Sequence, residues 1–155
     1  MGGDTEREVS LMSGKKVFKS LNLLGHQVVK VDGRDYKFLS HEDYKMDLIF
    51  NALHGGIGEN GVLQGFFDDL KIPYTGSGVL ASSLAMNKIL AKKRFTESGI
   101  NVAKDKLADI NDVIEKDPMS RPYVLKPIDG GSSIDIEIID KNFDTKILTA
   151  KNNKT

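Results

Sequence analysis

The chain has 155 residues, which is enough for one well-packed core or for one small domain and part of another. Lys and Arg total 22 and Asp and Glu total 22, so no excess of charge predicts binding to nucleic acid or to an anionic membrane. The absence of cysteine excludes disulfides, thiol nucleophiles and thiolate metal ligands, and the apolar runs are too short to span a bilayer. With no apolar leader segment near Met1, these features predict a soluble cytoplasmic protein.

The first half of the chain shows strand patterns alternating with helix patterns. A helix is predicted to begin with Ser10 as its cap and to end at Gly25. Residues 33–46 are polar and are expected to form a loop with a short helix. Strands are predicted at residues 26–31, 47–53 and 72–75, and one further helix is predicted at residues 62–70. This alternation indicates an α/β fold with a Rossmann-like parallel sheet, in which functional side chains gather at the carboxyl ends of the strands.

The pattern changes near residue 87. A helix over residues 80–97, followed by a short helix near 111–116, leads to an apolar strand that ends at Lys126. Apolar residues then alternate from 134 to 138 as a second strand, which predicts an antiparallel hairpin. Two domains are therefore expected, at residues 1–86 and 87–155.

The tip of this hairpin is a candidate anion site. Residues 126–133 read Lys-Pro-Ile-Asp-Gly-Gly-Ser-Ser. Small residues leave backbone N–H groups accessible to a polyphosphate, and the ammonium of Lys126 would neutralise charge. The alternative is an ordinary hairpin with a glycine-rich loop.

Two segments upstream carry candidate site residues. Residues 6–10 read Glu-Arg-Glu-Val-Ser, and Glu6 could meet a substrate amine, although acids at a helix start also stabilise its dipole. Residues 54–59 read His-Gly-Gly-Ile-Gly-Glu, so His54 could face a substrate carboxylate while Glu59 holds its other nitrogen. A structural histidine is the alternative. No second ligand falls at a usual metal-binding spacing.

These segments and several shorter motifs follow one another in a definite order along the chain. They are residues 2–3 with 6–10 and 13–14, 51–55 with 58–59 and 61, 63–65, 73–78 with 81–82, Met86 with Lys88 and Lys92, and 126–127 with 131–133. In this order and spacing they resemble the D-alanine–D-alanine ligase family of the ATP-grasp superfamily. The resemblance implies a Rossmann-like pre-ATP-grasp domain followed by the incomplete start of the ATP-grasp central α+β domain.

The resemblance also implies an activity, the ATP-dependent joining of two D-alanines through an acyl phosphate for peptidoglycan synthesis. Glu6 would orient the ammonium of the first D-alanine and share a hydrogen-bonded network with Ser132. His54, supported by Glu59, would lie near the acyl phosphate and the substrate carboxylate.

The implied cofactors are ATP and Mg²⁺. Lys88 and Lys126 would contact the phosphates of ATP, and Ser133 would belong to the loop that closes over them. No residue of this chain is predicted to bind a metal, because the Mg²⁺ ligands of the family lie beyond the matching segments. The family also suggests a homodimer.

The chain departs from the family pattern at several places. An apolar first strand is expected before Gly2, Asn60 stands where an acid is expected, and Ile134-Asp135 replaces Val-Gly. The adenine-binding linker and the acceptor-choosing loop are also missing. We therefore expect the N-terminal part of a ligase, inactive alone unless a second chain completes it. The alternatives are a non-catalytic remnant or binding module, and a fragment of a related enzyme such as a D-alanine–D-lactate ligase.

Overall fold

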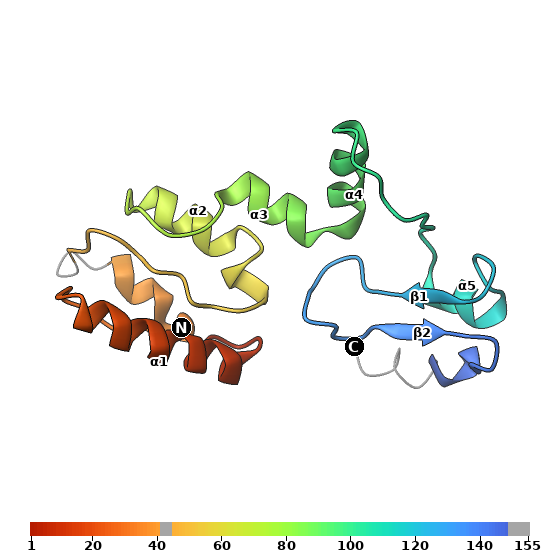
Figure 1. Ribbon diagram of the computed structural model, residues 1–155, viewed down its shortest axis with the longest axis horizontal. Helices are drawn as coiled ribbons and strands as arrows, with labels where there is room; N and C mark the ends of the chain where they lie inside the picture. Colours follow the sequence, from red (N-terminus) through yellow and green to blue (C-terminus); the bar gives the residue numbers. More distant parts are fainter. Residues whose placement is uncertain (41–44, 149–155) are drawn as a thin grey trace. The chain divides into compact units, whose positions relative to one another are not determined.

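The computed structural model describes residues 1–40 and 45–148 and divides the chain into two compact units. The first unit comprises Met1–Ala91 with Asp129–Ser132, and the second comprises Lys92–Ile128 with Ser133–Thr155 (Figure 1). This division falls after Ala91, and the domain boundary that the sequence predicts near residue 87 stays a prediction. Residues 41–44 of the expected loop at 33–46 lie outside the described residues, and so does the polar tail at 151–155.

The first unit begins with the long helix α1, Arg7–Leu23. The helix starts four residues earlier than predicted, with Glu6 as its N-cap residue, so the assignment of Ser10 as the cap is wrong. Ser10 is fully buried inside the helix, where its hydroxyl bonds to other segments instead of to the helix start. Gly25 ends the helix as predicted, with φ of 87°, a conformation that glycine adopts readily.

The parallel direction predicted for the sheet is confirmed at one bridge, which pairs Ile49 with Tyr74. The N–H of Ile49 donates to Pro73 O at 2.8 Å, and the N–H of Thr75 donates to Ile49 O at 3.0 Å. The continuous strands predicted at 26–31, 47–53 and 72–75 do not form within the described residues. A ladder needs hydrogen-bonded partners along its whole length, and within the described part of the chain the backbone of residues 27–30 makes no hydrogen bond to a neighbouring segment.

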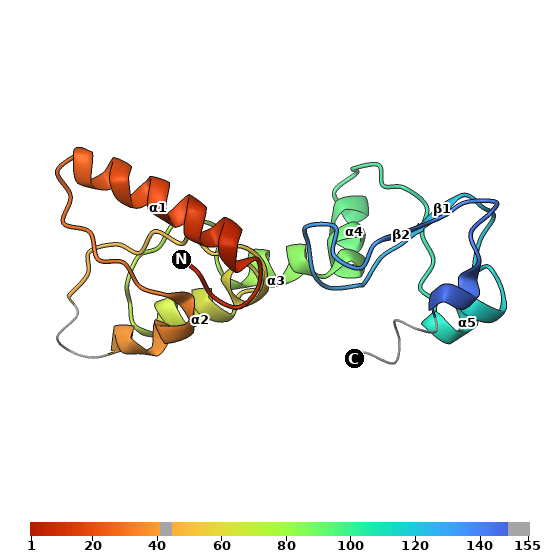
Figure 2. The ribbon, with the colours of Figure 1, turned by 90° about the horizontal axis from the view of Figure 1, so that it is seen from below.

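Two short 3₁₀ helices and two α-helices complete most of the first unit: η1 (Gly33–Ser40), η2 (Gly56–Gly58), α2 (Val62–Asp69) and α3 (Val79–Met86). α2 confirms the helix predicted at 62–70. Its Leu63 and Phe67 are 1% and 3% exposed and pack with Leu39 of η1 to form the core. α1 and α2 lie on opposite sides of the extended segments (Figure 2), as expected for an α/β layer.

The single helix predicted at 80–97 is wrong, because α3 ends at Met86 and α4 (Lys88–Glu97) begins two residues later. Asn87 separates them with ψ of 109°, outside the helical range. Its side-chain Oδ1 accepts from the N–H groups of Ile89 and Leu90, at 3.2 and 3.0 Å. Asn87 therefore caps α4, which is a common position for asparagine.

The second unit confirms the predicted hairpin. β1 (Tyr123–Leu125) pairs antiparallel with β2 (Glu137–Ile139), and Tyr123 lies opposite Ile139. β2 is shorter than the strand predicted from residue 134. The same unit contains α5 (Ile110–Glu115), capped by Asp109, and η3 (Thr145–Leu148), and the two are joined where the hydroxyl of Thr145 donates to Ile114 O at 3.2 Å.

A polar cluster supports the base of this hairpin. The hydroxyl of Tyr123 donates to Asp117 Oδ1 at 2.8 Å, and Arg121 forms an ion pair with the other carboxylate oxygen at 2.8 Å. Burial and the neighbouring carboxylate raise the pKa of Tyr123 to about 12. Among the helices of the described residues, none combines the length and the apolar character needed to cross a bilayer.

Candidate functional site

Glu6 stands where the chain turns into α1, in the left-handed conformation with φ of 47°. A Cβ at Gly55 would lie 3.0 Å from the Oε2 atom of Glu6 and 2.8 Å from the side chain of Thr5. Gly55 also has φ of 67°, so both the contact and the backbone favour glycine there. The carboxylate of Glu6 is therefore held against the turn that follows His54.

His54 is half-buried, and its Nε2 lies 3.0 Å from the hydroxyl oxygen of Ser13 on α1. The expected support from Glu59 is not found among the described residues. Glu59 is exposed and directly follows the tight turn of η2 (Gly56–Gly58). It lines a surface pocket together with Gln64 and Ser77. Ser13 is thus the partner that the structure gives to Nε2 of His54, and the support of its other nitrogen by Glu59 stays a prediction.

Ser10 joins the N-terminus to the segment that carries His54. Its hydroxyl accepts from the N–H of Gly2 at 2.8 Å and donates to Ala52 O at 2.7 Å. Sequence reasoning missed this role because serine near a helix start is normally read as a cap. A usable signal was the spacing of Ser10 and Ser13, which places both hydroxyls on one face of α1.

A second link fixes the start of the chain through Asp32. Arg7 binds its carboxylate with two hydrogen bonds, at 2.9 and 2.6 Å, and Gly3 N–H donates to it at 3.1 Å. The guanidinium of Arg7, helped by the backbone N–H groups of Arg34 and Gly3, holds the pKa of Asp32 well below its usual range. This pair was also missed, although Asp32-Gly33 directly follows a predicted strand.

Lys88 is the first residue of α4, and its ammonium donates to Gly130 O at 2.9 Å. This bond brings a cation to the glycine-rich turn within the first unit. A Cβ at Gly130 or Gly131 would meet nothing within 4 Å, so the turn is open on that side. Ser132 belongs to the same turn, with φ of 53°. An open turn beside a lysine fits a phosphate group.

Lys126 and Ser133 belong to the second unit, where Lys126 is exposed just beyond β1. Their part in one phosphate site with Lys88, and the convergence of Ser132 with Glu6, stay predictions. Within residues 1–40 and 45–148, no group of three or more His, Asp or Glu side chains suited to a metal occurs.

Comparison with known proteins bears on this arrangement. The family model described as the D-ala D-ala ligase N-terminus matches residues 31–77. The D-alanine–D-alanine ligase of Rickettsia canadensis is 48% identical over 139 residues, which are 89% of this chain and 39% of that protein. The ligase of Zymomonas mobilis is 46% identical over 145 residues, or 92% of this chain and 45% of that protein. The chain thus spans about two fifths of the length of the curated relatives it matches.

Solved structures agree with the sequence relatives. The crystal structure of D-alanine–D-alanine ligase from Bacillus anthracis aligns with a TM-score of 0.74 at 30% identity, over 97% of this chain and 50% of that one. The same enzyme complexed with ATP aligns with a TM-score of 0.74 at 28% identity, over 98% of this chain and 50% of that one. The similarity therefore extends over both units of the chain.

Proposed function

The chain belongs to the D-alanine–D-alanine ligase family, and we therefore propose that it forms the first-substrate part of an enzyme that joins two D-alanines with the use of ATP. In this role it would act in the cytoplasm, in peptidoglycan synthesis. The chain would work only together with the remaining part of such a ligase, whether joined to it or supplied as a separate chain. The homodimer suggested by the family belongs to the same proposal.

The position of Glu6 beside the turn after His54 is the observation that carries this proposal. The two residues are 48 positions apart in the sequence, yet Glu6 lies beside the turn at Gly55 that directly follows His54. A carboxylate can hold the ammonium of an amino acid, and an imidazole held by Ser13 can face its carboxylate. Together they would bind the two charged ends of D-alanine.

The turn at Gly130 supports the part of the proposal that concerns ATP. ATP supplies the phosphoryl group that activates the carboxylate of the first D-alanine. Lys88 stands at this turn as a fixed cation, and Lys126 and Ser133 would complete the contacts with the phosphates. Preplaced ammonium and N–H groups stabilise the charge that develops on phosphoryl oxygens. Mg²⁺, which the family implies, belongs to the same proposal, since it commonly binds through one or two carboxylates together with substrate phosphates.

A fusion protein tests the proposal. We expect this chain, joined to the remaining part of the Rickettsia canadensis ligase, to form D-alanyl-D-alanine from D-alanine and ATP. The chain alone should form none. In the fusion, Glu6→Gln should lower kcat/KM for D-alanine by at least about tenfold, because it removes a charge-assisted hydrogen bond. Glu8→Gln is the matched control, since Glu8 is exposed in the first turn of the same helix, and should change kcat/KM by less than about twofold.

Three results would contradict the proposal at different points. A folded fusion without ligase activity would reject the function. An active fusion in which Glu6→Gln and Glu8→Gln behave alike would keep the function and reject the role of Glu6. Product formed by the purified chain alone would show that it needs no further part.

A further inference from the structure

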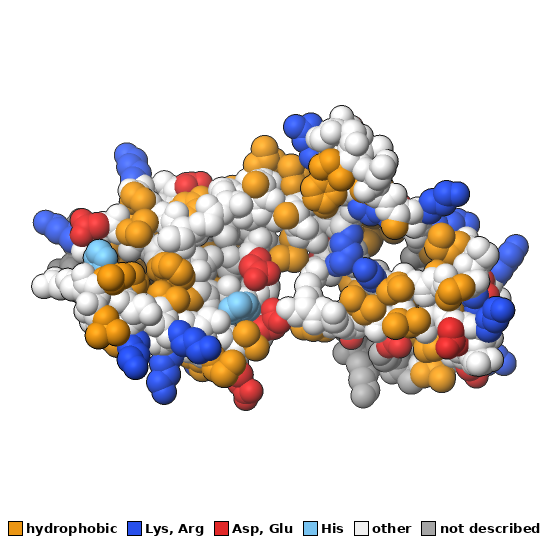
Figure 3. Space-filling model, in the orientation of Figure 1, with side chains coloured by type: hydrophobic (Ala, Val, Ile, Leu, Met, Phe, Trp, Pro, Cys, Tyr) orange, Lys and Arg blue, Asp and Glu red, His pale blue; other side chains and the backbone are white. Residues whose placement is uncertain are grey.

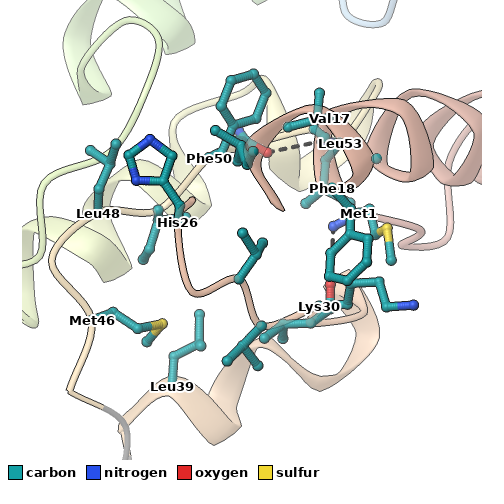
Figure 4. A pocket seen from close by; sticks show the side chains of 18 of the residues that line it. Met1, Val17, Phe18, His26, Lys30, Leu39, Met46, Leu48, Phe50 and Leu53 are labelled. Atoms are coloured by element: carbon teal, nitrogen blue, oxygen red, sulfur yellow. Dashed lines mark hydrogen bonds between the residues drawn. The ribbon is translucent and has the colours of Figure 1, made fainter. Parts of the chain in front are cut away.

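Two cavities of the first unit differ in the chemistry of their lining. The larger, of about 590 Å³, lies between residues 26–33 and 45–53, where apolar side chains such as Phe18 of α1 surround it (Figure 4). The smaller, of about 340 Å³, is the surface pocket that Glu59 and Gln64 line. Its lining combines alanines of α3 with side chains that carry oxygen, so it offers hydrogen bonds as well as apolar contact.

Gln64 of α2, which lines the surface pocket, has a buried side-chain oxygen without a partner. The residue is 4% exposed, and its Nε2 donates to Gly58 O at 2.8 Å. Turning the amide over would bring two acceptor oxygens together, so this orientation is fixed. Its Oε1 accepts no hydrogen bond from any described residue. A ligand that donates a hydrogen bond to Oε1 would therefore gain affinity.

The wall around Gln64 is held in place by a short network of hydrogen bonds. Asn51 Nδ2 also donates to Gly58 O, at 2.8 Å, and Asn51 Oδ1 accepts from the N–H of Leu53 at 3.1 Å. The N–H of Asn51 donates to the hydroxyl of Thr75 at 3.1 Å. These polar atoms of Asn51 are used within the protein, whereas Oε1 of Gln64 is not. The acceptor is thus preorganised, which lowers the entropic cost of binding a ligand.

The charge of the surface pocket comes from Glu59. This residue is exposed, and no Lys, Arg or His is among the described residues that line the pocket. Acidic and basic side chains both occur on the visible face of the first unit (Figure 3), so the sign of the pocket is set by this local carboxylate and not by a general field. A carboxylate and an unpaired carbonyl oxygen in one pocket favour a cation that donates N–H groups and disfavour an anion such as phosphate.

We infer that the surface pocket binds a small molecule that carries a primary ammonium group on a short alkyl chain. The ammonium would donate to Oε1 of Gln64 and to the carboxylate of Glu59, and the alkyl chain would lie against the alanines of α3. A quaternary ammonium has the same charge but no N–H to donate to Oε1. Glu6 and His54 do not line the pocket, so this site is distinct from the one proposed for the first D-alanine.

An NMR titration of the full chain tests this inference. The probe is n-butylammonium, and sodium chloride keeps the ionic strength constant. We expect saturable shift changes at the side-chain amide of Gln64 and at the backbone N–H groups of Glu59 and Ser77. Tetramethylammonium should bind at least about tenfold more weakly, because it cannot donate a hydrogen bond. Butyrate, which carries a negative charge on a similar alkyl chain, should cause no saturable change.

Three variants assign the two parts of the contact. Glu59→Gln should weaken binding of n-butylammonium at least about fivefold, because it removes the charge from the acceptor. Asp69→Asn is the matched control, since Asp69 is an exposed acid of α2 outside the pocket, and should change binding by less than about twofold. Gln64→Met removes Oε1 and should weaken binding at least about fivefold. Gln64 is buried, so the exposed Glu59 keeps the test decisive if Gln64→Met does not fold.

Three results would overturn the inference. Shifts that do not saturate with n-butylammonium would show that the pocket holds no amine and that water alone satisfies Gln64. Equal affinity for tetramethylammonium would show that the pocket senses charge without a hydrogen bond. Equal effects of Glu59→Gln and Asp69→Asn would place the binding elsewhere. None of these results bears on the proposed ligase function, which rests on Glu6 and His54.

Discussion

Residues 26–33 and 45–53 of the first unit run alongside each other as extended segments, and their two ends differ in how they are hydrogen-bonded. At the carboxyl end, around Asp32 and Ala52, side chains from α1 link the segments with short hydrogen bonds. At the amino end, around Val29 and Leu48, the segments border an apolar cavity and make no ladder. The candidate site lies at the bonded end. Its geometry therefore depends on side-chain hydrogen bonds more than on a continuous sheet.

The first test of this contrast makes the same substitution, leucine to alanine, at one core position and at one position beside the cavity. Leu63→Ala should lower the free energy of unfolding by about 2–5 kcal/mol, because Leu63 is 1% exposed in the core. Leu48→Ala, at a residue that is 56% exposed beside the cavity, should cost about 1 kcal/mol or less. Urea unfolding followed by NMR signals of residues 1–91 measures both. Equal losses would show that the cavity end is packed as tightly as the core.

The second test concerns the hydroxyl that bridges the bonded end. Ser10→Ala should cost about 2–3 kcal/mol, because it leaves the N–H of Gly2 and the C=O of Ala52 without their partner. Ser13→Ala is the control on the same helix and removes only the contact with His54, so it should cost about 1 kcal/mol or less. The same unfolding measurement applies. If both variants lose the same stability, the bridge through Ser10 is not what holds this end.

The third and smallest effect depends on pH. The pKa of Asp32 is lowered in the folded state, so its ion pair stabilises the fold above the unfolded value of about 3.9 and this contribution is lost as pH falls toward the folded value. Asp32→Asn should cost about 1–2 kcal/mol at pH 7, because the pair with Arg7 is partly exposed. The difference from the native chain should shrink below pH 4.

The control for this substitution is Asp35→Asn, at an exposed residue of η1. It should leave both the stability at neutral pH and its acid dependence nearly unchanged. A native chain whose stability stays level from pH 7 to pH 2 would contradict the role assigned to Asp32.

Local patterns in the sequence predicted much of this molecule. The helix α2, the direction of the bridge at Ile49 and the hairpin around Tyr123 were all predicted from apolar periodicity and turn residues. Each depends on residues close in sequence or on a regular repeat. The approach of Glu6 to the turn after His54 agrees with the rule that carboxyl ends of parallel strands share one edge.

The errors have a different origin. Ser10 and Asn87 each carry a side chain that can cap a helix, and sequence alone does not say which of them does. The contact of His54 with Ser13, which was not predicted, depends on how α1 lies against a distant loop. Continuous strands were expected from composition, but a ladder also needs a neighbour, and a periodic pattern does not show whether that neighbour is present.

The bond between Tyr123 and Asp117 has an optical consequence. The chain has 4 tyrosines and no tryptophan, so tyrosine governs its near-ultraviolet absorbance. The Tyr123 phenol keeps its proton until about pH 12, two units above an ordinary tyrosine, as long as the hairpin holds it against the carboxylate. Because burial also raises the pKa of Tyr74, an alkaline titration at the phenolate band of a Tyr74→Phe variant would report whether this hairpin is folded, without any label.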